Sequence, residues 1–237
     1  SVAKALGYYV YLYINPESGE VFYVGKGKGI RALSHLKKGS DSRVGQEIYR
    51  IRQRGLEPRV EILIHGLRDE RAAFEVEMAA INLLGLDNLV NEVSGHHSAQ
   101  QGRMSLEQIR SLYLRKPVKI TDPVILIRVA KAFRYDMSDH DLYDITRTAW
   151  VVGGRREKAE YALAVYDGIV REVYKISQWL PAGSTFVNDK PRGNRHGVRW
   201  EFVGVVADEQ IRKKYRNRDV TKYFKQGSQN PVFYVNC

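Results

Sequence analysis

Tyrosine, arginine and histidine side chains lie close together between Tyr9 and His35, and these residue types suit chemistry on a phosphate group. Arg31 precedes His35 by four residues, and Tyr11 and Tyr23 lie on two short runs that are rich in tyrosine and valine. A tyrosine can act as a base, an arginine can clamp phosphate oxygens, and a histidine can donate a proton. Tyrosine is a poor base at its ordinary pKa of about 10, so a nearby positive charge must lower that pKa.

A carboxylate that could bind a metal lies further along the chain, where Glu75 and Glu77 compete for the role. The surrounding sequence predicts a helix with an apolar stripe formed by Phe74, Met78, Ile81 and Leu84. Glu77 lies on this stripe, whereas Glu75 lies about 200° away around the helix, towards the polar face. Because an isolated buried charge is costly, Glu77 requires a partner, and a divalent cation or a salt bridge would serve; a stripe edge open to water is the remaining alternative.

The elements that must position these residues form a small α/β layer. Residues 8–14 and 21–24 predict two strands, joined by a turn that contains Asn, Pro, Ser and Gly. Residues 25–29 predict a close glycine-rich turn. Three helices follow, from about residue 30, at 42–54 and at 69–84. Residues 59–64 predict a strand, and residues 89–93 a short extended piece. The order β-β-α-α-β-α predicts a small sheet covered by helices.

The pattern changes after about residue 95, which predicts a second domain. We expect a first domain at residues 1–95, a polar linker and connecting helix at 96–118, and a second domain at 119–237. Ser105 and Gln108 form a predicted capping box at the start of the connecting helix. The second domain predicts a β-rich α+β fold, with strands at 124–129, 161–166, 169–176, 198–206 and 233–235 and helices at 138–148 and 207–216. Such a pattern favours a compact, barrel-like sheet.

The net charge of +11 is concentrated in the second part of the chain. Residues 1–100 contain 13 Lys and Arg and 12 Asp and Glu, whereas residues 101–237 contain 25 and 15. A positive field of this size attracts polyanions, nucleic acid first. Basic residues beside aromatic ones favour phosphate contact with stacking, and the candidates are Arg155, Arg156, Lys190, Arg192, Arg195, Arg199, Arg212, Lys213, Lys214 and Arg216. The three tryptophans favour core positions over nucleic-acid contact.

Composition excludes several classes of protein. No apolar run approaches the length of a membrane span, of about 18 residues, and the first residues lack the pattern of a secretory signal. The single cysteine, Cys237, allows no disulfide framework and no cysteine metal site within one chain. We therefore expect a protein of the reducing cytoplasm with no membrane partner.

The paired tyrosine motifs resemble those of the GIY-YIG nuclease superfamily. Its first half-motif corresponds to residues 9–11, where Tyr9 replaces the usual glycine, and its second to residues 23–25. Arg31 and His35 follow at a spacing found in many members. The resemblance covers roughly residues 7–95 and is strongest to the branch that contains metazoan nucleases with ankyrin repeats and a LEM domain, although no ankyrin repeat is present here.

This resemblance implies a metal-dependent endonuclease that hydrolyses phosphodiester bonds in DNA. Glu77 would hold Mg²⁺ or Mn²⁺, Arg31 would clamp the scissile phosphate, and Tyr11 or Tyr23 would activate or orient the attacking water.

Three further residues take supporting roles in this resemblance. Lys26 and His35 would position groups or tune the pKa of a tyrosine, and Asn91 would brace the site through hydrogen bonds.

The second domain would select the DNA by its sequence, its structure or a modified base, in a restriction-like or repair-like role. Its strand pattern loosely resembles the PUA-like barrels that hold modified or flipped bases. Two alternatives stay open: a catalytically degenerate nucleic-acid-binding protein, and a nuclease directed at RNA.

Overall fold

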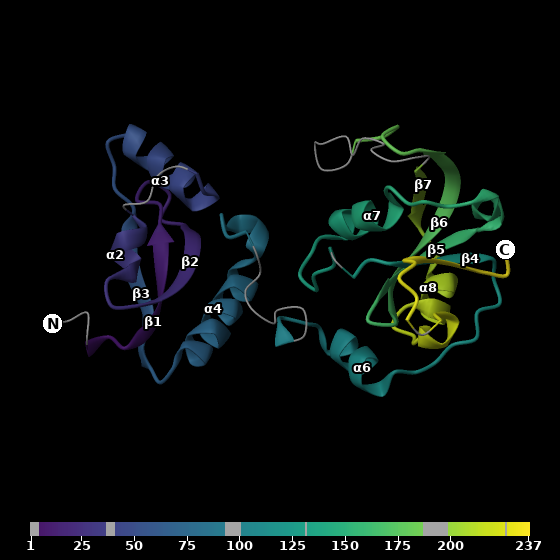
Figure 1. The fold of residues 1–237 in the computed structure, drawn as a ribbon, viewed down its shortest axis with the longest axis horizontal. Helices are drawn as coiled ribbons and strands as arrows, with labels where there is room; N and C mark the ends of the chain where they lie inside the picture. Colours follow the sequence, from purple (N-terminus) through teal and green to yellow (C-terminus); the bar gives the residue numbers. More distant parts are fainter. Residues whose placement is uncertain (1–4, 37–40, 93–100, 131, 187–198, 226) are drawn as a thin grey trace. The chain divides into compact units, whose positions relative to one another are not determined.

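The computed structural model describes residues 5–36, 41–92, 101–130, 132–186, 199–225 and 227–237. The chain forms two compact units, Ser1–Arg103 and Met104–Cys237 (Figure 1). The connecting helix, α6 (Leu106–Leu114), belongs to the second unit, although its sequence placed it with the linker. It begins at the predicted capping box, in which Ser105 and Gln108 bond each other's backbone N–H groups.

The first unit is built on a three-stranded antiparallel sheet with the order β2-β1-β3. The strands are β1 (Tyr8–Ile14), β2 (Val21–Lys28) and β3 (Arg59–Leu67). The helices are α2 (Arg31–His35), α3 (Arg43–Gln53), α4 (Glu70–Leu84) and the 3-10 helix η1 (Leu86–Asn88). This is the α/β layer that the sequence predicts.

Alternation along β1 divides the core of this unit into two layers. Tyr9, Tyr11 and Tyr13 pack with α2 and α3, whereas Val10 packs with α4 on the opposite face. Figure 1 shows α2 and α4 on opposite sides of the sheet. β1 is the central strand and β2 is an edge strand. Side chains from the layer of α2 and α3 and from the layer of α4 can therefore both reach β2.

One predicted element of the first unit is wrong in detail. The glycine-rich residues 25–28 continue strand β2, instead of forming a turn. A Cβ added at Gly25 would lie 2.6 Å from Tyr11 Cζ and 2.8 Å from Tyr23 Cε1, so the glycine is required by close packing in a strand. The extended piece predicted from residue 89 contacts β2 through one backbone bond, Val90 N to Phe22 O at 2.8 Å, and through the Asn91 side chain, and it forms no strand over residues 89–92.

The second unit contains a five-stranded mixed sheet with the order β7-β6-β5-β4-β8. Its strands are β4 (Val124–Arg128), β5 (Tyr161–Tyr166), β6 (Ile169–Pro181), β7 (Trp200–Val206) and β8 (Val232–Val235). Only the β4–β5 pair is parallel among these strands. Within the described residues β7 and β8 are the edges of the sheet and do not pair, so closure into a barrel stays a prediction.

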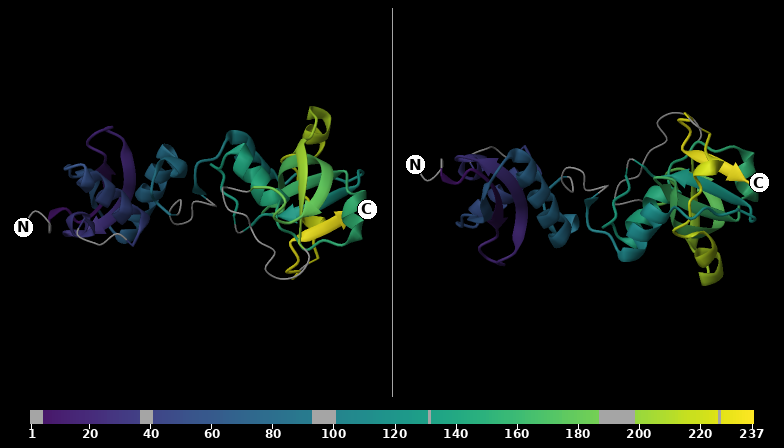
Figure 2. Two further views of the ribbon diagram at one scale, coloured as in Figure 1. Left: turned by 90° about the horizontal axis from the view of Figure 1, so that it is seen from above. Right: turned by 90° about the horizontal axis from the view of Figure 1, so that it is seen from below.

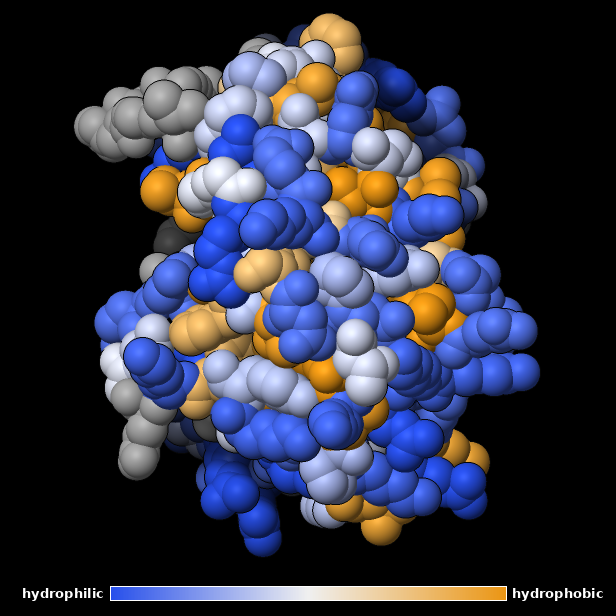
Figure 3. Space-filling model, turned by 90° about the vertical axis from the view of Figure 1, so that its right-hand side faces the viewer, coloured by the Kyte–Doolittle hydropathy of each residue, from blue (hydrophilic) through white to orange (hydrophobic). Residues whose placement is uncertain are grey.

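Helices cover this second sheet on both faces (Figure 2). On one face lies α7 (Asp139–Arg147), and on the other lies α8 (Glu209–Tyr215). The unit also contains α6 and the 3-10 helices η2 (Gly154–Lys158) and η3 (Thr221–Tyr223). Trp179 is buried in the layer beneath α7, and Trp150 and Trp200 pack against the same layer. Trp179 therefore lies in the core, as the sequence favours for the tryptophans, and Trp150 and Trp200 are partly buried against it. Hydrophilic residues cover most of the face drawn in Figure 3, with hydrophobic residues in small separate groups.

Candidate active site

The outer edge of strand β2 brings two of the predicted site residues together. Asn91 Oδ1 accepts a hydrogen bond from Val24 N at 3.0 Å, and Asn91 Nδ2 donates to Val24 O at 2.8 Å. Further along the same edge, by two residues, the backbone N–H of Lys26 donates a hydrogen bond to Glu77 Oε1 at 2.9 Å. These side chains satisfy backbone groups that an edge strand otherwise leaves open. Glu77 and Asn91 are thus held in register by the strand itself.

Helix α4 separates the two glutamates as the sequence phase predicts. Glu75 is exposed and pairs with Arg71 at 3.1 Å, whereas Glu77 is half-buried. Burial raises the pKa of Glu77, and the Lys26 N–H together with the charges of Lys26 and Arg31 opposes that rise. Glu77 is therefore a carboxylate that stands to gain from a bound cation.

Four tyrosine rings contact one another on strands β1 and β2: Tyr9, Tyr11, Tyr13 and Tyr23. The Tyr11 ring lies 5.2 Å from that of Tyr13 and 6.1 Å from that of Tyr23, measured between ring centroids. Tyr11 is 1% exposed, and burial raises its pKa far above the ordinary value. Burial also raises the pKa of Tyr13, to about 12.

Tyr23 differs from Tyr11 in its surroundings. It is half-buried, and burial and the charge of Glu77 raise its pKa. A hydrogen bond with Tyr11 and the charge of Arg31 lower it. Tyr23 is therefore electrostatically coupled to both the carboxylate and the arginine of the site.

Arg31 owes its position to tyrosines that the sequence analysis did not select. Tyr9 Oη accepts a hydrogen bond from Ala32 N at 3.1 Å and donates to Gly29 O at 3.0 Å. Tyr13 Oη donates to Ala32 O at 2.6 Å. The residue beside Arg31 is thus held through both of its backbone groups. Tyr9, which replaces the glycine of the first half-motif, anchors the start of α2.

The two cations near the site differ in what they contact. Lys26 Nζ lies 2.6 Å from Glu70 Oε1 and 3.8 Å from the centroid of the Phe74 ring, so it is engaged within the protein. The hydrogen bond and charge of Lys26 lower the pKa of Glu70. Arg31 is exposed and forms no ion pair or side-chain hydrogen bond with any described residue. Arg31 is therefore available to an external anion.

The structure thus brings Tyr11, Tyr23, Lys26, Glu77 and Asn91 to one end of strand β2, with Arg31 coupled to them by charge. His35 is the last residue of α2, and its side chain lies outside the described part of the chain, as do the adjacent histidines at 96 and 97. The positioning role of Tyr9 and Tyr13 was missed, although the alternation of tyrosines at 9, 11 and 13 on one strand face could have indicated it.

The donor set fits a hard divalent cation that keeps most of its water. Among the described residues, no three His, Cys, Asp or Glu side chains lie together as a complete protein cage. Mg²⁺ is commonly bound by one or two carboxylates together with waters and substrate phosphates. Glu77 offers one such carboxylate, and a hydrogen bond from Lys26 N fixes its Oε1. Burial raises the pKa of Glu77, so a nearby positive charge would stabilise its ionised form.

The candidate nucleic-acid contacts of the second unit are dispersed, and most of them contact other parts of the protein. Arg155 and Arg156 lie over the rings of Tyr234 and Trp200, at 4.9 and 3.5 Å. Arg199 Nη1 donates to a backbone carbonyl, Ala149 O, at 2.8 Å. Lys190, Arg192 and Arg195 lie outside the described residues.

The basic residues of α8 divide into two groups. Lys214 Nζ contacts Asp122 Oδ2 at 2.5 Å and Thr121 Oγ1 at 2.6 Å, which ties the helix to the start of β4. Arg212, Lys213 and Arg216 instead line a hollow on the surface of the unit, together with residues of α6.

Comparison with known proteins identifies a family for part of the chain. Residues 18–116 match the family described as LEM-3-like GIY-YIG domain. The match assigns this region to the GIY-YIG nuclease superfamily, and it implies a nuclease-type function and a nucleic-acid substrate. It begins after β1, so the first half-motif lies outside it, and it includes helix α6. No curated protein and no solved structure matches the chain. No helix in the described part of the chain is both long and apolar enough to span a membrane.

Proposed function

We propose that the first unit is a divalent-metal-dependent endonuclease that hydrolyses phosphodiester bonds in DNA. The arrangement of Glu77 and Asn91 on the β2 edge, beside Tyr23 and an Arg31 that forms no ion pair with a described residue, carries the proposal. Hydrolysis joins the oxygen of a water to phosphorus and breaks one bridging P–O bond. When bound at Glu77, the metal would neutralise phosphate charge and stabilise the leaving oxygen.

The protein's own groups supply the other parts of this chemistry. Arg31 would contact the non-bridging oxygens of the scissile phosphate and stabilise the charge that develops on them. Asn91 would keep the β2 edge rigid, because both of its polar atoms bond the buried backbone of Val24. Lys26, held by Glu70, would contribute its field and its backbone N–H.

Tyr23 is the better supported proton acceptor for the attacking water. Tyr11 is almost fully buried, and its hydrogen bond with Tyr23 lowers the pKa of Tyr23. Glu77 raises the pKa of Tyr23, so neutralising that carboxylate with a cation would lower it again. Tyr11 then acts by orienting Tyr23, and the metal and the base are coupled through Glu77.

A cleavage assay with Mg²⁺ or Mn²⁺ tests this proposal on plasmid, branched and base-modified DNA, with RNA in parallel. We expect cleavage of at least one DNA that Glu77→Gln abolishes and that Glu75→Gln retains. Tight DNA binding without cleavage in either metal would support the degenerate binding protein instead. Cleavage of RNA alone would support the RNA-directed nuclease.

The second unit would select the DNA, and a cavity supports recognition of a single unstacked base. The cavity has a volume of about 490 Å³, within the range typical of small-molecule sites. It lies where β4 ends, and its walls combine apolar, aromatic and amide-bearing residues: Val129, Ala132, Ile145, Trp150, Gln229 and Pro231. Enzymes that extract a base hold it by stacking and by hydrogen bonds to its edge.

Two features fix the walls of this cavity. Trp150 is bonded through its backbone to Trp200, at 2.9 and 2.8 Å, and through Nε1 to Thr146 O at 2.7 Å. The preceding Ala149 has a φ of 50°, which is costly for a residue with a side chain and directs the chain into Trp150. Arg128 lies 4.1 Å from the Phe224 ring and donates to Ser228 O at 2.9 Å, so its guanidinium is held in place.

Filling the cavity tests this selection role. Ala132 is exposed on the cavity wall, so Ala132→Trp should block entry of a base without disturbing the core. We expect this variant to lose preference among DNAs that carry different modified bases, whereas Ala182→Trp, outside the cavity, should retain it. Equal preference in both variants would exclude a role of the cavity in selection.

A further inference from the structure

A second hollow in the C-terminal unit is lined mainly by positive charge. It has a volume of about 310 Å³ and lies between helices α6 and α8. The two helices present the same spacing towards it, with a glutamate followed by an arginine three residues later: Glu107 and Arg110 on α6, Glu209 and Arg212 on α8. The remaining lining residues include four further cations, Lys116, Lys213, Arg216 and Arg218.

Within the described residues, the ion pairs of this hollow lie on the side of α8. Glu172 accepts two bonds from Arg212, at 3.0 and 2.7 Å, and lies 3.7 Å from Arg216 Nε, and Glu209 lies 3.4 Å from Arg212 and 4.0 Å from Lys213. By contrast, Arg110, Lys116 and Arg218 form no ion pair or side-chain hydrogen bond with any described residue. Because these three cations outnumber Glu107, the carboxylate on the side of α6, they raise the local potential and attract an anion.

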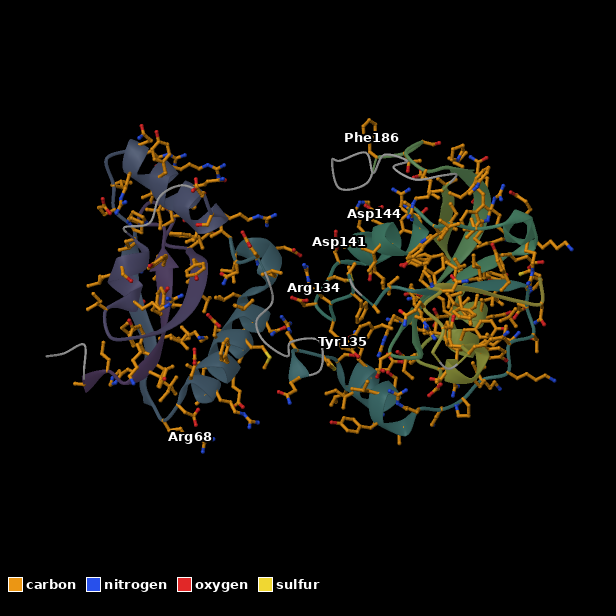
Figure 4. All side chains as sticks on the ribbon, viewed as in Figure 1. Arg68, Arg134, Tyr135, Asp141, Asp144 and Phe186 are labelled. Carbon is orange, nitrogen blue, oxygen red and sulfur yellow. The ribbon has the colours of Figure 1, made fainter. Side chains whose placement is uncertain are left out.

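A buried arginine behind the wall adds to this potential. Arg171 is 5% exposed, and no carboxylate among the described residues lies within ion-pair distance of it. Its Nη1 donates to Ser111 Oγ at 3.2 Å, and Ser111 lines the hollow. Its Nη2 donates to Tyr135 Oη at 2.8 Å (Figure 4 labels Tyr135, on the loop before α7), and its Nε has no partner in the described part of the chain.

The field of Arg171 therefore extends towards the hollow. The centroids of the Phe133, Tyr135 and Tyr166 rings lie 5.8, 4.9 and 5.8 Å from its guanidinium, so its surroundings are largely apolar. Charges in a low-dielectric environment are screened less than those on the surface. A phosphate group suits this site, since it can accept several charge-assisted hydrogen bonds from arginine forks at once.

We infer that the hollow between α6 and α8 binds phosphate groups of the nucleic-acid backbone. This inference rests on the proposed function, because it takes DNA as the substrate and gives the second unit a defined contact with it. It extends the sequence prediction for Arg212, Lys213 and Arg216 to Arg218, two residues further along the chain, and to Arg110 and Lys116, which lie far away in the sequence. Phosphate contacts of this kind give affinity and register, without reading sequence.

The salt dependence of DNA binding tests this inference. Binding is measured in EDTA, so that it does not depend on catalysis, with a short duplex at 50 and 200 mM salt. Arg110→Gln/Lys116→Gln removes two exposed cations that have no protein partner. Losing two phosphate contacts should reduce the slope of log K against log salt by roughly 2, so the ratio of Kd values at the two salt concentrations should fall about tenfold.

A matched variant separates the hollow from general charge. Lys158→Gln/Lys175→Gln removes the same charge from exposed positions outside the hollow, and we expect its slope to stay close to the wild-type slope. Equal changes in both double variants would overturn the inference. A second result would also overturn the inference: inorganic pyrophosphate raises the Tm of the wild type only, and both double variants keep the wild-type DNA affinity. The ligand of the hollow would then be a free phosphate compound. Normal salt dependence of binding without any cleavage would refute the nuclease proposal alone.

Discussion

The two units use charged side chains in opposite ways. In the first unit the acidic and basic residues nearly balance, and the site depends on a few groups held by buried backbone contacts, such as Glu77 on Lys26 N and Arg31 beside the anchored Ala32. In the second unit cations are in excess by ten over residues 101–237, and many of them are engaged with acids or aromatic rings. Breaking a bond requires exact placement of few groups, whereas holding a polyanion requires many charges.

Glu77→Gln should have the largest effect on this division of roles. The amide keeps an oxygen that can accept from Lys26 N but cannot bind a divalent cation with the strength of a carboxylate. We expect DNA cleavage to fall by about a thousandfold or more, comparable to the loss of a principal electrostatic group. DNA binding in EDTA should change little, because the cations of the second unit remain.

Glu75→Gln is the matched control for that change, since Glu75 lies on the exposed face of the same helix. Its cleavage rate should stay within about twofold of the wild type. If both variants cleaved at the wild-type rate, the assignment of the metal to Glu77 would be wrong.

Arg31→Gln should have the next largest effect, a loss of about 10²–10³ in the cleavage rate constant. Arg31 has no ion pair with a described residue, so its removal leaves no buried charge behind and the fold should be retained. The rate constant is best measured with protein in excess over DNA. A large rise in Kd with an unchanged rate constant would instead make Arg31 a simple binding residue.

The pH dependence of cleavage distinguishes the two tyrosines. Their pKa values are raised by burial, so the deprotonated form of either one increases about tenfold per pH unit below its pKa. Cleavage should therefore rise with pH from 6 to 9. In Tyr23→Phe this rise should disappear, and in Tyr11→Phe it should persist at a lower overall rate. A pH profile that Tyr23→Phe leaves unchanged would contradict Tyr23 as the proton acceptor.

Much of the first unit could be predicted because local signals agree with its tertiary structure. The helices α3 and α4 begin one residue after the predicted starts, at which Ser42 and Asp69 serve as N-caps, and the helix phase correctly separated Glu77 from Glu75. The extension of β2 through Gly25 was not predicted, because the need for glycine there arises from the rings of two distant tyrosines.

In the second unit, local patterns predicted the strands but not the basic hollow. Asp167 and Gly168, the two residues between the predicted strands at 161–166 and 169–176, have φ values of 50° and 75°, as a tight hairpin requires. The hollow could not be predicted, since Arg110 and Arg218 are more than a hundred residues apart in sequence. Roles for the cations at 190, 192 and 195, which lie outside the described residues, remain predictions.

Asn91→Ala tests the edge of the first unit through stability. It leaves the N–H and C=O of Val24, a fully buried residue, without their partner, at a cost of about 1–3 kcal/mol for each group. Urea unfolding should show this loss. Asn88→Ala, which removes one exposed hydrogen bond to Leu84 O, should cost less than about 1 kcal/mol. Equal losses would mean that Asn91 does not support the strand.

Glu77 should also affect stability, with the smallest expected effect. The pKa of Glu77 is raised in the folded protein. Its favourable contribution to the free energy of unfolding is therefore present below the pKa that it has in the unfolded chain, and is lost as the pH rises through the pKa that it has in the folded protein. Without metal, Glu77→Gln should therefore raise the Tm slightly at pH 7 but not at pH 4. Added Mg²⁺ should raise the Tm of the wild type only, and an equal shift in both would place the ion elsewhere.

The division between cutting and holding is tested most directly by the single-turnover rate of DNA cleavage, measured against protein concentration. We predict that Glu77→Gln lowers the plateau rate by about a thousandfold, whereas Arg110→Gln/Lys116→Gln chiefly raises the protein concentration that gives half of the plateau. If the Glu77 variant kept the wild-type plateau, or if the double variant lowered the plateau without changing the half-saturating concentration, the two units would not divide the work in this way.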